Sequence, residues 1–316
     1  MIAIEVKNLV KKYDRITVLD NLDLEINEGE FHCLMGPNGS GKTTLSSIIA
    51  SIRKPTSGEI KIYGKKPEHS KKLIGYVPQE SFSDPNLTGL ENICYFAGML
   101  GYPNKEKKLV AEKILKSLDL FDDRNKRVSK YSGGMRKKLE LGTILFPRIR
   151  IFILDEPTTG LDPAARRNFF GYIDELKDKS TTVLLVSHIG SDAELAEKVG
   201  LMDKGKIIAE GSPDELKNGS GLKNIININV SVKNERIKNI LNGFNEGGQL
   251  LETNEGYKLY SGKNFEVIPE IVRRIESNGY KVLQIGSVEP SLEDVFFKLT
   301  GKRIRDAEEE LNGVKK

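Results

Sequence analysis

The run Gly36-Pro37-Asn38-Gly39-Ser40-Gly41-Lys42-Thr43-Thr44 says more about the fold than any other part of this 316-residue sequence. It fits the pattern G-x-x-x-x-G-K-[ST] of a phosphate-binding loop. The glycines allow a tight turn that points backbone N–H groups inward, and a helix that begins near Lys42 adds its positive end. The apolar run FHCLM (31–35) precedes the loop, as the motif requires. The sequence therefore predicts a nucleoside triphosphate site.

Four side chains have specific expected roles in this site. Lys42 is expected to reach the β- and γ-phosphates, and the hydroxyl of Thr43 to ligate Mg²⁺. The run IFILDE (151–156) predicts a buried strand with two carboxylates at its end. Ligands of parallel α/β sheets bind at the carboxyl ends of the strands. We therefore expect Asp155 to hold the Mg²⁺ shell through water and Glu156 to act as general base on the attacking water.

The composition predicts a globular protein of a reducing compartment. The net charge is only +4, from 49 basic and 45 acidic side chains, which is too weak for a histone-type nucleic-acid binder, and no nucleic-acid partner is expected. The longest uncharged stretch, 92–104, is shorter than the roughly 20 apolar residues of a membrane-spanning helix. Glu5 and Lys7 interrupt any secretory signal, and two scattered cysteines make no disulfide framework.

The hydrophobic pattern predicts an α/β fold. Short apolar runs at 31–35, 72–78, 151–154 and 181–187 alternate with helix-length segments at 42–53, 106–118 and 164–177. Such alternation favours a mostly parallel sheet covered on both faces. Three other segments, IAIEVKNLV, ITVLDNLDLEI and GEIKIYG, have the alternating polarity of antiparallel strands. Residues 87–146 contain no convincing strand and predict a helical insertion.

A second domain is predicted after a linker signal, KNGSG, at 217–221. The following pattern has the order β-α-β-β-α-β-α, which suits a small two-layer α+β sandwich. We therefore divide the chain into a nucleotide-binding domain (1–217), an accessory domain (218–302) and a charged tail (303–316). The apolar stripe of the last helix, 292–299, favours plain core packing.

A third motif, YSGGM at 131–135, lies about twenty residues before Asp155. With the two motifs above, it makes residues 3–217 resemble the ATP-binding subunit of an ABC transporter. The resemblance implies a P-loop NTPase domain of the ABC type, with a mixed sheet core, an antiparallel β subdomain and a helical subdomain. It also implies that Ser132, Gly133 and Gly134 contact the γ-phosphate of ATP held by the opposite subunit.

The resemblance assigns four more side chains. Gln79 would contact Mg²⁺ and water and sense a membrane partner, Asp162 would lie at a dimer seam, His188 would hydrogen-bond the γ-phosphate, and Tyr13 would stack on adenine. Without this context, His188 and Tyr13 would be ordinary structural residues at strand ends. The motif departs from the commonest pattern at Tyr131, where leucine is usual, which bears on the subfamily.

The resemblance also implies a mechanism and partners. Two copies would pair head to tail around ATP, hydrolysis would open the homodimer, and the movement would drive a separate integral membrane permease at the inner face of the cell membrane. Segments such as LTGLENICYFAGMLGYP and EPSLEDVFFKLTG are similar to those of export-type subunits. Two alternatives stay open: a soluble ABC ATPase acting on ribosomes or nucleic acid, and a nucleotide-gated scaffold without enzymatic activity.

Overall fold

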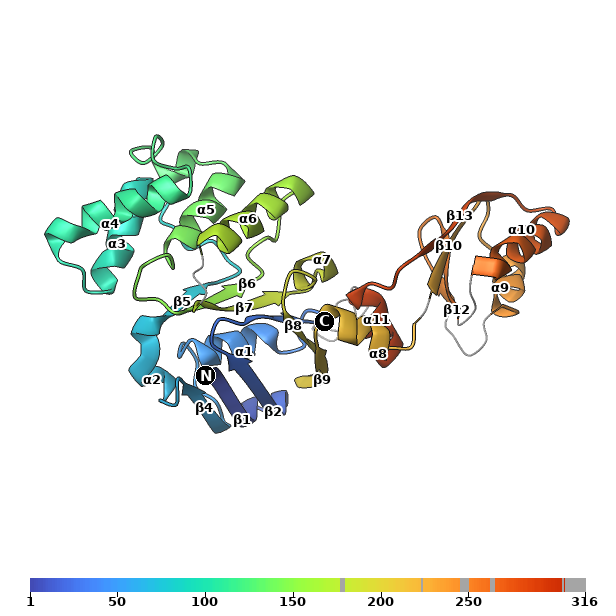
Figure 1. The fold of residues 1–316 in the computed structure, drawn as a ribbon, viewed down its shortest axis with the longest axis horizontal. Coiled ribbons are helices and arrows are strands. Elements are labelled where there is room, and N and C mark those ends of the chain that lie inside the picture. Colours follow the sequence, from blue (N-terminus) through green and yellow to red (C-terminus); the bar gives the residue numbers. More distant parts are fainter. Residues whose placement is uncertain (177–179, 223, 245–249, 262–264, 303, 305–316) are drawn as a thin grey trace. The chain divides into compact units, whose positions relative to one another are not determined.

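The computed structural model describes residues 1–176, 180–222, 224–244, 250–261, 265–302 and 304. It divides into two compact units, Met1–Ile208 and Ala209–Lys316, and each unit is described by itself (Figure 1). The domain boundary at Lys217 stays a prediction. The tail at 303–316 lies outside the described residues apart from Ile304. In the described part of the chain, no helix has the length and hydropathy of a membrane-spanning segment.

The first unit is built on a six-stranded sheet with the order β5-β6-β7-β3-β8-β9. All pairs from β5 to β8 are parallel, as the alternating pattern predicts. The central strands β3, β6 and β7 are buried along their whole length, which explains their continuous apolar runs. The strands are β3 (Phe31–Met35), β5 (Ile74–Val77), β6 (Ile151–Asp155), β7 (Thr182–Ser187), β8 (Lys198–Asp203) and β9 (Lys206–Gly211).

Strands β8 and β9 form a hairpin that the sequence analysis missed. Lys204 and Gly205 join them with positive φ angles of 47° and 79°, as in a two-residue turn between antiparallel strands. A Cβ on Gly205 would lie 2.4 Å from the Val18 carbonyl oxygen, so the turn requires glycine. The Gly205 N–H donates to the carbonyl oxygen of Ser40 at 2.9 Å, which holds the hairpin tip against the loop 36–41. The sheet is therefore mixed.

A second, antiparallel sheet of the first unit has the order β2-β1-β4, as predicted. Helix α1 lies between this sheet and the six-stranded one (Figure 1). Its Leu45, Ile48 and Ile49 share one hydrophobic cluster with residues of both sheets. Because both faces of α1 are covered, the position of its first residue, Lys42, is tightly fixed. The elements are β1 (Ile2–Tyr13), β2 (Ile16–Asn27), β4 (Ser57–Ile62) and α1 (Lys42–Ile49).

The insertion at 87–146 is helical, as predicted. Thr88 and Glu91 form a capping box at the start of α3, and the Ser132 side chain caps α5. The insertion holds α3 (Gly89–Met99), α4 (Asn104–Ser117), the 3₁₀ turn Val128–Lys130 and α5 (Gly133–Gly142). The unit is completed by α2 (Pro67–Ser70), the 3₁₀ turn Lys71–Leu73, α6 (Pro163–Leu176) and α7 (Gly190–Ala193).

The second unit contains an antiparallel sheet with the order β11-β12-β10-β13. Helices α9 and α10 cover one face, where Ile226 and Ile228 of β10 are buried. On the other face, Ile225 packs with Phe297 of α11. The predicted α+β order is confirmed: β10 (Asn224–Val230), α9 (Glu235–Asn242), β11 (Leu250–Glu252), β12 (Gly256–Ser261), the 3₁₀ turn Phe265–Val267, α10 (Ile268–Ser277), β13 (Val282–Val288) and α11 (Leu292–Thr300).

The Gly/Ser/Asn run at 217–221 is not an extended linker. Its first three residues are the last turn of α8 (Pro213–Gly219). A capping box between Ser212 and Glu215, with Pro213 at the first helical position, starts this helix strongly enough to include them.

Tyr131 is the unusual residue of the YSGGM motif, and it packs against Gly89 at the start of α3. The Tyr131 hydroxyl donates a 3.0 Å hydrogen bond to the Asp123 carbonyl oxygen, and burial raises the pKa of this phenol to about 12. A Cβ on Gly89 would lie 2.2 Å from the hydroxyl oxygen but 3.1 Å from the nearest ring carbon. The glycine therefore makes room for the hydroxyl group.

We expect Gly89→Ala to lower the free energy of unfolding by about 1–3 kcal/mol, because the methyl group overpacks this contact. Tyr131→Phe removes the clashing oxygen and costs about 1 kcal/mol for its lost hydrogen bond. The double variant should be less destabilised than the sum of the two single variants, as measured by denaturant unfolding. Gly171→Ala, where a Cβ meets open space in α6, serves as the control. Additive effects would contradict the packing argument.

Candidate nucleotide site

The loop 36–41 joins β3 to α1 and lies tightly against neighbouring backbone. Gly39 and Gly41 have φ angles of 80° and 105°, which favour glycine. A Cβ on Gly36 would lie 2.1 Å from the Met202 carbonyl oxygen, and one on Gly41 would lie 2.9 Å from that of Val18. These glycines are therefore required by the fold itself, in addition to any ligand.

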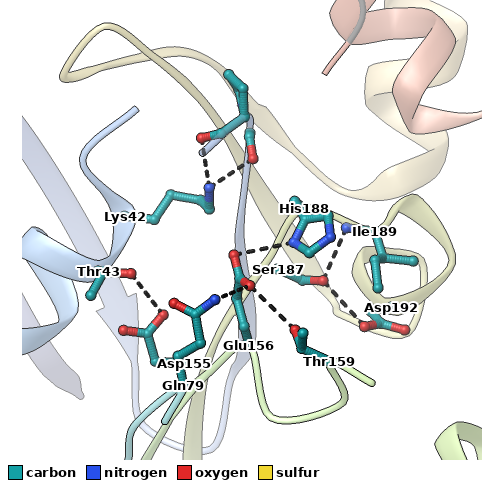
Figure 2. A network of polar contacts seen from close by, with 12 residues as sticks. Lys42, Thr43, Gln79, Asp155, Glu156, Thr159, Ser187, His188, Ile189 and Asp192 are labelled. Carbon is teal, nitrogen blue, oxygen red and sulfur yellow. Dashed lines mark hydrogen bonds and ion pairs between the residues drawn. The ribbon is translucent and has the colours of Figure 1, made fainter. Parts of the chain in front are cut away.

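Lys42 is buried at the start of α1, with only 4% of its surface exposed. Its Nζ donates hydrogen bonds to the carbonyl oxygens of Gly36 (2.7 Å) and Pro37 (2.8 Å), so the ammonium group lies inside the curve of the loop (Figure 2). A fixed positive charge within this loop, at the start of a helix, suits a phosphate. Of the other predicted residues, Asn38 and Ser40 lie in the loop and Thr44 lies in α1.

Asp155, at the end of β6, receives three hydroxyl groups. Thr43 Oγ1 donates to its Oδ1 at 3.0 Å, and Ser46 Oγ and Tyr76 Oη donate to its Oδ2 at 3.2 and 3.1 Å. Burial raises the pKa of Asp155, the three hydroxyl groups oppose this shift, and the charge of Glu156 adds to it. The structure therefore brings Thr43 and Asp155 together as predicted, whereas Ser46 and Tyr76 were missed.

Glu156 is the centre of a second cluster, shown in Figure 2. Its carboxylate accepts hydrogen bonds from Gln79 Nε2 at 2.9 Å and Thr159 Oγ1 at 3.3 Å, and lies 3.1 Å from His188 Nδ1. Burial opposes ionisation, but His188 and the charge of Lys42 outweigh it and hold the pKa of Glu156 below its ordinary value. Three residues predicted from separate motifs therefore meet, and their contacts favour the ionised form of the carboxylate.

The oxygen atoms near Lys42 and Glu156 determine which metal fits. In the described part of the chain, no group of three or more His, Cys, Asp or Glu side chains could hold a metal ion by itself. The predicted ligands are instead one hydroxyl group (Thr43), one carboxylate (Asp155) and one side-chain amide (Gln79). Such a sparse, oxygen-based set suits Mg²⁺, which binds through one or two carboxylates together with substrate phosphates.

Ser132 and Asp162 lie in a different setting, at the starts of two helices. Ser132 Oγ accepts a hydrogen bond from the Met135 N–H at 3.2 Å, and the two following residues, Gly133 and Gly134, face open space. Asp162 Oδ1 accepts the N–H groups of the second and third residues of α6 at 2.9 and 3.0 Å, which lower its pKa. The described contacts of these residues do not include Lys42 or Glu156 of the same chain.

Tyr13 has cationic neighbours at the end of β1. Its hydroxyl oxygen accepts a 2.7 Å hydrogen bond from Arg53, and Lys11 Nζ lies 4.7 Å from the ring centroid. The residue is 38% exposed. Its stacking on adenine stays a prediction.

A buried carboxylate near His188 was missed by the sequence analysis. Asp192 accepts hydrogen bonds from Thr158 and Ser187, and burial raises its pKa against these donors and the charge of Arg166. Asp192 follows His188 by four residues, but His188 precedes α7, which spans only Gly190–Ala193. The two side chains therefore do not share a helix face, and the spacing indicated nothing.

Comparison with known proteins decides the family. A family model described as ABC transporter matches residues 19–159. A daunorubicin resistance ATP-binding protein of Streptomyces coeruleorubidus is 32% identical over 97% of both chains. The chain belongs to the ABC transporter family. A Nod factor export ATP-binding protein of Burkholderia thailandensis is 31% identical over 96% of this chain and 98% of its own. A linearmycin resistance ATP-binding protein of Bacillus subtilis is 29% identical over 96% and 100%.

Solved structures agree with this ABC assignment. The ATP-binding cassette MJ0796, in a dimeric post-hydrolysis state with ADP and Pi, has a TM-score of 0.61 and 29% identity. The match covers 66% of this chain and 98% of the MJ0796 chain. An ATP-binding subunit of an ABC transporter has a TM-score of 0.62 and 28% identity, over 70% and 94%.

The chain is thus an ATP-binding and ATP-hydrolysing subunit whose family function is ATP-driven transport. The expected ABC-type fold, with its mixed sheet and antiparallel and helical subdomains, is confirmed. The findings support neither the alternative of a soluble ATPase acting on ribosomes or nucleic acid nor that of a scaffold without activity.

We expect Lys42→Ala to weaken ATP binding by about 100-fold or more, because it removes the buried charge that faces the phosphates. A fluorescent ATP analogue, titrated at fixed ionic strength, measures the affinity. Lys54→Ala, on an exposed residue of the same charge, is the matched control. Equal affinities of the Lys42 and Lys54 variants would contradict the assignment of the loop.

Proposed function

We propose that two copies of this chain bind ATP head to tail and that its hydrolysis drives an exporter whose permease is a separate integral membrane protein. The observation that carries this proposal is the division of the predicted residues into two groups. Lys42 and Asp155 lie near enough to Glu156 for their charges to interact with it, whereas the hydrogen bonds described for Ser132 and Asp162 reach none of these three residues in the same chain. A second copy supplies the missing half of each site.

The reaction follows from the contacts of Glu156. Its low pKa keeps it ionised at neutral pH, so it accepts the proton of the attacking water as general base. Gln79 and His188 orient this carboxylate through their contacts with it, and in this proposal His188 also hydrogen-bonds the γ-phosphate. Lys42 and the loop N–H groups stabilise the charge that develops on the phosphate oxygens. Loss of the γ-phosphate removes the contacts with Ser132 and opens the dimer.

Mg²⁺ is the metal in this proposal. Thr43, Asp155 and Gln79 would hold it, directly or through water. When bound, it neutralises charge on the β- and γ-phosphates. The hydroxyl groups of Ser46 and Tyr76 orient Asp155, so the chain presents a fixed carboxylate oxygen to the ion.

The direction and place of transport rest on the relatives. Their names attribute daunorubicin resistance, linearmycin resistance and Nod factor export to them. We infer export of an organic compound, with this subunit bound at the cytoplasmic, inner face of the cell membrane through its permease. Co-purification with a membrane protein of several spans tests the permease, and recovery with ribosomes instead would contradict it.

Glu156→Gln should keep ATP affinity within about 3-fold and lower turnover by more than about 100-fold, because the amide cannot accept the proton. Since ATP then stays bound, the variant should accumulate as a dimer in ATP and Mg²⁺ and as a monomer in ADP. Light scattering after size exclusion gives the mass, and phosphate release gives the rate. Glu68→Gln, on an exposed residue, is the charge-matched control. Normal turnover would exclude Glu156 as the base, and a monomer in ATP would contradict the head-to-tail dimer.

Asp155→Asn should raise the Mg²⁺ concentration for half-maximal ATP turnover by about 10–100-fold, because a ligand charge is lost. Tyr76→Phe, which removes only one hydrogen bond to this carboxylate, should raise it far less. Mg²⁺ titrations of phosphate release at saturating ATP compare the two variants. An unchanged Mg²⁺ requirement in Asp155→Asn would remove this residue from the proposed metal site.

A further inference from the structure

Asp192 is a buried carboxylate that the proposed reaction does not use. It lies on α7 with 1% of its surface exposed. Its Oδ2 accepts hydrogen bonds from Thr158 Oγ1 at 2.8 Å and from Ser187 Oγ at 3.1 Å. Since two buried hydroxyl groups donate to one oxygen, the carboxylate joins two separate segments of the chain.

These two segments carry the proposed reacting groups. Thr158 follows Glu156 by two residues, and Ser187 immediately precedes His188. Ser187 Oγ also accepts the Ile189 N–H at 3.1 Å, so contacts on both sides of His188 fix its backbone (Figure 2). Asp192 is thereby connected to the Glu156 turn and to the His188 turn through one hydroxyl group each.

The sheet alone does not fix these turns. Between β6 and β7, the last paired residues are Asp155 and Val186, and the Glu156 N–H still donates to the Val186 carbonyl oxygen at 2.9 Å. On its other side, β7 pairs as far as Ser187, so His188 follows the last paired residue of this strand. Glu156 also has a φ angle of 48°, which leaves the strand conformation. The 3.1 Å approach of its carboxylate to His188 therefore depends on side-chain contacts beyond the strand ends.

A third connection reaches the helix that Asp162 caps. Arg166 Nε, on α6, lies 3.7 Å from Asp192 Oδ1. This distance is an ion-pair contact rather than a hydrogen bond. Its opposite charge favours the ionised form of a carboxylate that burial would otherwise neutralise.

We propose that Asp192 is a positioning residue, which holds the Glu156 turn and the His188 turn together through Thr158 and Ser187. The inference rests on the proposed role of Glu156 as general base. In this role, Asp192 acts through Thr158 and Ser187 and takes no part in the reaction itself. It sets the geometry in which Glu156 and His188 act, and it ties that geometry to the helix at the predicted dimer seam.

The test compares two substitutions at each end of one hydrogen bond. Asp192→Ala removes the acceptor and should lower kcat by about 10–100-fold, because misplacement of a reacting group by even 1 Å is costly. The KM for ATP should stay within about 3-fold, since the Lys42 loop is untouched. Asp192→Asn keeps an acceptor oxygen and should recover most of kcat. Thr158→Val should lower kcat, whereas Thr158→Ser, which keeps the hydroxyl group, should not.

The outcomes separate this inference from the proposed function. The positioning role would be overturned if Asp192→Ala left kcat unchanged, or if it raised the KM for ATP instead of lowering kcat. Equal kcat values for Thr158→Val and Thr158→Ser would overturn it too, a result that still decides the question if the Asp192 variants do not fold. Glu156→Gln is assayed alongside. If Glu156→Gln is inactive and Asp192→Ala is fully active, the positioning role alone is refuted. Turnover by Glu156→Gln would refute the role of Glu156 as general base, and with it the positioning role that depends on it.

Discussion

Close contact between backbones at the glycine loop is the constraint on which the rest of the first unit depends. The loop 36–41 lies so near the carbonyl groups of Met202 and Val18 that no side chain fits at Gly36 or Gly41. This contact seats the loop between the two sheets and begins the buried helix α1 at Lys42. The charged group is thereby fixed before any ligand arrives, and little ordering remains to be done on binding.

From this fixed point, the parallel strands bring distant parts of the sequence together. The ends of β6 and β7 carry Glu156 and His188, and the segment after β5 carries Gln79. Because neighbouring parallel strands end at the same edge, residues far apart in the chain meet there. Behind these residues, hydroxyl groups donate hydrogen bonds to two buried carboxylates, Asp155 and Asp192. Each carboxylate therefore has hydrogen-bond partners although it is buried away from water.

The sequence predicted most of this arrangement where a pattern carries its own physical reason. Apolar runs indicate buried strands, and the P-loop glycines form a motif. The parallel part of the sheet, and the contacts of Thr43 and Asp155 at its edge, could therefore be predicted. The β8–β9 hairpin was missed because Lys204-Gly205 is a weak form of the usual turn dipeptide.

The supporting polar residues were missed for another reason. Ser46, Tyr76, Thr158 and Asp192 belong to no periodic pattern, and they matter only through contacts across the fold. The partners in these contacts are 34 or more residues apart, so a local sequence window contains one partner and not the other. Composition also indicated a linker at 217–221, but the first three of these residues belong to a capped helix, 213–219.

The backbone of Glu156 has a consequence for how this enzyme can be stabilised. A left-handed conformation in a residue other than glycine costs about 1–3 kcal/mol, and the φ angle of 48° places Glu156 in that region. Glycine at this position would relieve this backbone strain and abolish the chemistry. Directed evolution for heat resistance alone would therefore drift toward an inert protein, and any such campaign must select for turnover at the same time.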